Sequence, residues 1–161
     1  MTQAESLDRA RAAGAEMADH GRMNAETMNA IITAKKEAAD KIKAALDAYA
    51  DHFASDLPTS AILIHYEKGQ PDNRYYSGLV YYSPKYKRLS RALISRWSPI
   101  TFTYDPTKGE VPNYPEQMYV DTTSCNSDDY LRYGYSAMDA MSQIVSNTQL
   151  ARRDFSRPVR A

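Results

Sequence analysis

The chain has 161 residues, and its formal net charge is zero because 20 basic residues balance 20 acidic ones. This length fits one soluble domain with a real hydrophobic core. The longest aliphatic run, residues 61–64, is far shorter than the roughly 20 apolar residues of a membrane span, and residues 1–20 lack the apolar centre of a secretion signal. A cytoplasmic or virion-associated protein without a membrane partner is therefore expected.

Residues 1–57 predict an N-terminal helical arm. Thr2 and Glu5 have capping-box spacing at the start of a first, short helix that is expected to stop near Gly21. Asn24 then offers an N-cap for a long helix over residues 25–56, because Pro58 prevents continuation.

The apolar residues of this long helix follow helical spacing, and Leu46, Tyr49 and Phe53 are expected to anchor it on the core. Its first half is mostly alanine and favours packing against another helix. That helix is either the first helix, folded back as an antiparallel hairpin, or a helix of another copy.

Residues 58–151 predict a tyrosine-rich α+β body. Strands are expected over residues 61–67 and 74–83, with a turn-rich loop between them. Residues 84–97 fit either a helix that begins at Ser83-Pro84 or a strand over 91–97. Further strands are expected over residues 99–104 and 118–123, joined by a proline-rich loop, and a last helix over 127–151.

The predicted architecture is a long N-terminal helix or helical hairpin, an antiparallel four-stranded sheet and a C-terminal helix. Residues 152–161 are expected to form a basic tail. In this tail, Phe155, Arg157 and Arg160 suggest an extended segment that binds a groove of a neighbouring molecule. The alternative is a solvated tail that aids solubility.

Thirteen tyrosines stand against three phenylalanines, which is typical of surfaces that are half in contact and half in water. Charge is also segregated: residues 1–73, 74–104, 105–131 and 132–161 carry −4, +6, −5 and +3. Such blocks can neutralise one another within the fold, pair between copies or attract an anionic partner.

The segment 74–97 interleaves cations and aromatic rings, a combination that single-stranded nucleic-acid binders use. Protein contact is the preferred interpretation, because the chain has no helix-turn-helix or RNP-like signature and its pI of about 6.8 is not basic. The candidate interaction residues, with those of the tail, are Tyr75, Tyr76, Tyr82, Tyr86, Arg88, Arg91, Arg96, Trp97, Phe155, Arg157 and Arg160.

Motifs for chemistry are scarce. Six glycines form no phosphate-binding pattern, and His20, His52 and His65 lie on separate predicted elements without zinc-ligand spacing, so no cofactor or metal is expected. The lone Cys125 precedes a predicted helix, whose dipole would lower the thiol pKa, with His65 as a candidate base.

The sequence as a whole predicts a non-enzymatic structural protein that acts through protein contacts, as a homo-oligomer and a component of a virion-like particle. The alternatives are a nucleic-acid-binding or inhibitory regulator that uses residues 74–97, and a thiol-dependent enzyme that uses Cys125.

Overall fold

The computed structural model describes residues 2–69, 75–96, 99–116 and 118–156, with the backbone alone at positions 68, 69, 75, 76 and 154–156. The elements, in chain order, are helix α1 (Gln3–His52), the short 3-10 helix η1 (Ala54–Asp56), strands β1 (Ile62–Gly69), β2 (Tyr75–Ser83), β3 (Arg88–Arg96), β4 (Thr101–Asp105), β5 (Gly109–Asn113) and β6 (Met118–Ser124), and helix α2 (Ser127–Ser156). Contacts divide the chain into two compact units, Met1–Ala38 and Ala39–Ala161.

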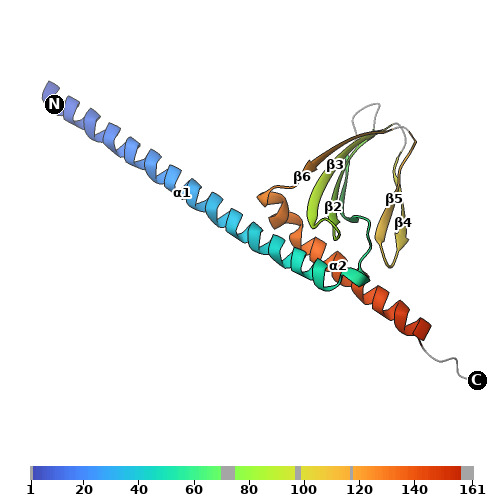
Figure 1. Ribbon diagram of the computed structural model, residues 1–161. Coiled ribbons are helices and arrows are strands. Elements are labelled where there is room, and N and C mark those ends of the chain that lie inside the picture. The colour runs from blue at the N-terminus through green and yellow to red at the C-terminus, as the bar shows by residue number, and fades with distance from the viewer. Residues whose placement is uncertain (1, 70–74, 97–98, 117, 157–161) are drawn as a thin grey trace, which may run out of the picture. The chain divides into compact units, whose positions relative to one another are not determined.

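Strands β1, β2, β3 and β6 form an antiparallel four-stranded sheet in that order, and β4 and β5 form a separate two-stranded hairpin (Figure 1). The predicted α+β fold, with its long N-terminal helix, antiparallel four-stranded sheet and C-terminal helix, is confirmed.

Helix α1 begins at the predicted capping box. The Thr2 hydroxyl accepts a hydrogen bond from the Glu5 amide at 3.2 Å, and the Glu5 carboxylate accepts one from the Thr2 amide at 3.0 Å. The predicted break near Gly21 is wrong, because α1 is continuous, and the helical hairpin is therefore absent. One glycine costs a helix only about 1 kcal/mol, and the ion pair of Asp19 with Arg22 spans this position.

The end of α1 is also earlier than expected. The α-helix stops at His52, and η1 takes up residues that were predicted to complete the helix before Pro58. The long helix anchors on the core as expected: Leu46 is only 1% exposed, and Tyr49 and Phe53 are partly buried against the same cluster.

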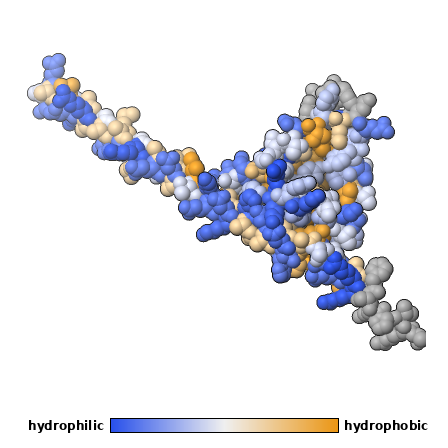
Figure 2. Space-filling view, viewed as in Figure 1, coloured by the Kyte–Doolittle hydropathy of each residue, from blue (hydrophilic) through white to orange (hydrophobic). Residues whose placement is uncertain are grey.

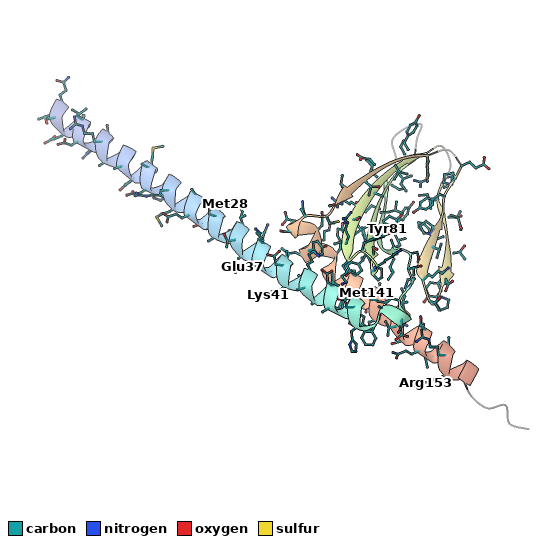
Figure 3. All side chains as sticks on the ribbon, in the orientation of Figure 1. Met28, Glu37, Lys41, Tyr81, Met141 and Arg153 are labelled. Carbon is teal, nitrogen blue, oxygen red and sulfur yellow. The ribbon has the colours of Figure 1, made fainter. Side chains whose placement is uncertain are left out.

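The larger core cluster of the second unit lies between one face of the sheet and the helices. Met141 of α2, labelled in Figure 3, is a fully buried member of this cluster. Its buried members are Ala39, Leu46, Ala50, Leu57, Ile62, Val80, Tyr82, Leu89, Tyr130, Tyr133, Ala137, Met141, Ile144 and Val145. A smaller cluster on the other face joins Leu79, Ala92, Ile94 and Ile100, with Phe102 of the hairpin packed against it.

The two alternatives for residues 84–97 are now resolved. β3 pairs with β2 without a register shift, from Tyr75 opposite Arg96 to Ser83 opposite Arg88, so the helix alternative is wrong and the strand alternative is confirmed for its described part. Residues 97 and 98 lie outside the described residues. Sheet pairing on both sides of β3 outweighs the helical spacing of Leu89 and Leu93.

The proline-rich segment contains a strand that was not predicted. Pro112 lies in β5, opposite Phe102 of β4. Proline is tolerated there because a two-stranded hairpin leaves one side of each strand unpaired. Gly109 has φ 82° after the β4 turn, in the left-handed region that favours glycine.

Gly134 of α2 lies directly against α1. A Cβ built at Gly134 would clash with a methyl group of Ile42, because the two carbons would be closer than such contacts in real proteins. Glycine is therefore a packing requirement here rather than only a weak helix former.

We expect Gly134→Ala to destabilise the fold, although alanine favours an isolated helix. Overpacking costs about 1–3 kcal/mol, which exceeds or cancels the gain of about 1 kcal/mol in helix propensity. Urea denaturation of this variant and of Gly14→Ala, where a Cβ meets nothing within 4 Å, provides the comparison. Equal stabilisation by both substitutions would contradict the close packing.

Candidate interaction surface

The basic and aromatic residues of 74–97 do not form one face. Neighbouring residues of a strand point to opposite sides of the sheet. Arg91 therefore lies on the side of α2, near Tyr133, whereas Arg88 lines a groove on the side of the β4–β5 hairpin.

Two of the predicted interaction residues are interior. Tyr82 is 0% exposed and donates a hydrogen bond to the Asp47 carboxylate at 2.9 Å. Arg96 is 1% exposed and donates to the hydroxyls of Ser77 at 2.8 Å and Tyr66 at 3.3 Å. Both side chains therefore stabilise the fold and are not available to a partner.

Other predicted residues are at the surface. Tyr86 is 71% exposed in the β2–β3 turn, Arg88 is exposed at the start of β3, and the Arg91 guanidinium lies 3.6 Å from the Asp129 carboxylate. Tyr75 and Tyr76 are on the β2 backbone. Their side chains, with Trp97, the Phe155 side chain, Arg157 and Arg160, lie outside the described residues.

The C-terminal helix is longer than predicted. It continues past residue 151 to Ser156, so residues 152–156 of the predicted tail are helical. Arg152 explains part of this extension, because its guanidinium pairs with the Asp56 carboxylate and donates to the Ser55 carbonyl at 2.6 Å. These contacts join the last turns of α2 to η1.

Cys125 is half-buried against the core, and its environment is opposite to the one expected for a nucleophile. Burial, followed by the Asp129 carboxylate, raises the pKa of the thiol to about 11, although Arg91 acts in the other direction. Asp129 is fixed there by a reciprocal capping box with Asn126, at 3.1 and 3.0 Å. The predicted lowering of the Cys125 pKa is therefore wrong.

We expect slow alkylation of Cys125 at neutral pH. Only the thiolate reacts, so a pKa near 11 predicts a rate with iodoacetamide at pH 8 at least roughly tenfold below that of an ordinary thiol. The rate should continue to rise above pH 9, and urea-unfolded protein should react normally. Equal rates for folded and unfolded chains at pH 8 would contradict this assignment.

β6 has the most exposed surface of the sheet. It is the last strand in the order β1-β2-β3-β6, so one of its edges is free in the described structure. All seven of its residues are exposed, including Met118 at 38%, Tyr119 at 74% and Val120 at 50%. A free edge presents unpaired backbone N–H and C=O groups to any strand that can lie beside it.

The two outer strands of the sheet differ in protection. β1 has a register irregularity between Leu63 and His65 and lies against β5 of the hairpin. β6 has neither lysine nor proline from Met118 to Ser124, and its pairing with β3 has no shift. Bulges, lysine, proline and covering segments are among the usual means of blocking edge pairing. Described β6 has none of these four, and its one charged side chain is Asp121.

An apolar groove of about 660 Å³ lies beside β6, between β3, β6 and the β4–β5 hairpin. Met118, Val120 and Ile94 line the sheet side. Tyr81, labelled in Figure 3, forms a hydrogen bond with Tyr114, which follows the hairpin. The exposed apolar residues of β6 therefore continue into a recessed apolar surface.

Among the described residues, no three His, Cys, Asp or Glu side chains are grouped so that they could hold a metal ion. The described helices also include none that is long and apolar enough to cross a membrane. No protein-family model matches the chain, and searches found no similar curated protein and no similar solved structure. A functional proposal therefore rests on the geometry alone.

Proposed function

We propose that this chain is a non-enzymatic assembly protein that associates with a second copy of itself by edge-to-edge pairing of β6. The observation that carries the proposal is the free edge of a regular strand whose seven residues are all exposed. Pairing would satisfy the free backbone groups of both edges and remove exposed apolar side chains from water.

A second copy is a suitable partner because β6 is self-complementary in one antiparallel register. With Val120 opposite Val120 of the second copy, Tyr119 stands opposite Asp121 and Met118 opposite Thr122 on each side of a twofold axis. A register centred one residue later would place the two Asp121 carboxylates opposite each other, which is unfavourable. The Val120 register separates the like charges and pairs apolar residues at its centre.

The N-terminal unit presents a further apolar surface. Leu7, Met17 and Met28 lie within a sector of about 80° around the helix, at 3.6 residues per turn, and are 54%, 76% and 58% exposed. Ile31 and Ile32 are exposed next to Met28, and Figure 2 shows apolar patches among the polar residues of this segment. Gly14 and Gly21 between them permit close helix approach. These exposed apolar residues and glycines fit a helix that packs against helices of other chains.

Sedimentation velocity of Val120→Lys tests the proposal. A lysine at the centre of the paired edges would place two like charges opposite each other. Wild type is expected to sediment as a dimer or larger species over the micromolar to millimolar range, and Val120→Lys as a smaller one. Tyr104→Lys is the matched control, since Tyr104 is 57% exposed on the hairpin.

Two outcomes would overturn the proposal. One is a wild-type chain that remains monomeric over the whole range. The other is association of Val120→Lys that equals that of wild type, while both retain the same circular dichroism spectrum.

A further inference from the structure

A second concave site lies on the other face of the sheet. The pocket has a volume of about 510 Å³, which is within the range of small-molecule sites. Its lining includes His65, Glu67, Gly78, Arg91, Asp121 and Tyr133. Strands β1, β2, β3 and β6 supply the floor and helix α2 one wall, so all its parts belong to the second unit.

The pocket is hollow because Gly78 has no side chain at its centre. Gly78 is opposite Glu67 on one side and Leu93 on the other. A Cβ at Gly78 would meet only the Glu67 Cβ, at 3.9 Å, so nothing in the described fold fills this space. Leu93, itself opposite Asp121 of β6, adds an apolar floor beside the gap.

Tyr133 carries a buried polar group in the wall. The residue is only 4% exposed, and its hydroxyl donates to no acceptor among the described residues, although the Arg91 guanidinium lies near enough to interact with it. Such a group costs about 1–3 kcal/mol unless something satisfies it. The Tyr133 ring is held by His65, with ring centroids 5.1 Å apart, so the hydroxyl has a fixed position.

A cation stands beside this hydroxyl. Burial lowers the pKa of the Arg91 guanidinium, but the Asp129 carboxylate and the nearby Tyr133 hydroxyl together raise it by more. The pKa is therefore above its ordinary value, and the guanidinium stays charged. Arg91 of β3 is paired with Thr123 of β6. Its guanidinium has five N–H donors, and the contact with the Asp129 carboxylate at 3.6 Å leaves most of them for a ligand. Arg91 and Tyr133 together provide donors for a carboxylate.

Two carboxylates line the pocket from the outer strands of the sheet, Glu67 from β1 and Asp121 from β6. Glu67 contacts His65 at 3.1 Å and Arg132 at 3.7 Å, so its charge is already balanced. Asp121 is exposed at the lining and makes no hydrogen bond or ion pair with another described residue. Asp121 is two residues from Thr123, which is the residue of β6 paired with Arg91, so Asp121 and Thr123 lie on the same face of the sheet.

From this arrangement we infer that the pocket binds a free amino acid, with its carboxylate on Arg91 and Tyr133 and its ammonium on Asp121. Donors on Arg91 and Tyr133, with the Asp121 carboxylate as an acceptor on the neighbouring strand, match a zwitterion better than a simple anion or a simple amine. The apolar floor of Val80 and Leu93 accommodates a side chain. This binding site goes beyond the assembly function, and it shares Asp121 of β6 with the proposed paired edge.

The test is isothermal titration of the full chain with each of the common L-amino acids. Matched carboxylic acids without the amino group and matched amines without the carboxylate are titrated in parallel. At least one amino acid is expected to bind, and its two monofunctional analogues to bind at least tenfold more weakly. The inference is overturned if none of the amino acids binds at millimolar concentration, or if an analogue binds as tightly.

Variants separate binding from folding. Gly78→Val fills the gap with a residue that favours strands, so binding is expected to disappear while thermal stability is kept. Tyr133→Phe removes an unsatisfied hydroxyl, so stability should not fall, whereas affinity should fall at least tenfold. Asp121→Asn should weaken the zwitterion and leave the carboxylic acid unaffected, with Glu110→Gln on β5 as the control. Undiminished affinity in Gly78→Val would place binding elsewhere and overturn the assignment.

Discussion

Replacing Leu46 with alanine is expected to lower the free energy of unfolding by about 2–5 kcal/mol. Leu46 is 1% exposed within the larger core cluster, so the substitution removes buried methyl groups and leaves a cavity between α1 and the rest of the core. The cost is a large fraction of the stability of an ordinary domain. Chemical denaturation followed by circular dichroism measures it.

Leu150→Ala is the matched control for this prediction. Leu150 is 54% exposed on α2, so the same chemical change there removes much less buried area. Equal losses of stability in the two variants would show that the buried face of α1 is not the anchor described above.

Ser77→Ala is expected to cost about 1.5–3 kcal/mol, the value of a hydrogen bond to a charged group. The Ser77 hydroxyl is buried and accepts the bond from the Arg96 guanidinium at 2.8 Å, inside the sheet. It also donates to Tyr66 at 3.3 Å, so the substitution removes two contacts of one buried network. Alanine leaves the charge of Arg96 with one acceptor fewer.

The control is Ser90→Ala, a serine of β3 on the same face of the sheet. Loss of its hydroxyl is expected to change the free energy of unfolding by less than about 0.5 kcal/mol. A Ser77→Ala variant within this same limit would contradict the importance of the Arg96 network.

The sequence predicted the fold where local pattern and tertiary packing agree. The capping box at Thr2, the anchor at Leu46 and the charged first turn of α2 are local signals, and each has its expected structural role. The fourth strand of the sheet was also expected, since residues 118–123 are rich in residues that favour strands.

The features that were predicted wrongly depend on contacts between residues far apart in the chain, and a single sequence does not reveal those contacts. The helical spacing of Leu89 and Leu93 was misleading because β3 is paired on both sides. Arg96 was expected at the surface on account of its charge, but Ser77 and Tyr66 supply acceptors in the interior. Cys125 was expected to have a lowered pKa from a helix dipole, but burial is the larger effect.

The edge position of β6 also depends on contacts between residues far apart in the chain. A strand at residues 118–124 can be read from its composition, whereas its place at the end of the sheet follows only from the order β1-β2-β3-β6. Gly78 is a similar case. A glycine in a strand indicates either that another group approaches the backbone closely or that space is left open, and only the residues on the neighbouring strands show that Gly78 lines a pocket.

Oxidative crosslinking of Val120→Cys tests the central claim most directly. In the proposed register the two copies of residue 120 are opposite each other, with Cβ atoms about 4.5–5.5 Å apart, close to the separation that a disulfide spans. Native Cys125 is half-buried, and Cys125→Ser removes it from the measurement. Thr122→Cys is the control, because residue 122 would stand opposite Met118 and far from its own copy. The account predicts rapid disulfide-linked dimers of Val120→Cys and few of Thr122→Cys. Equal crosslinking at both positions, or none at Val120→Cys, would contradict it.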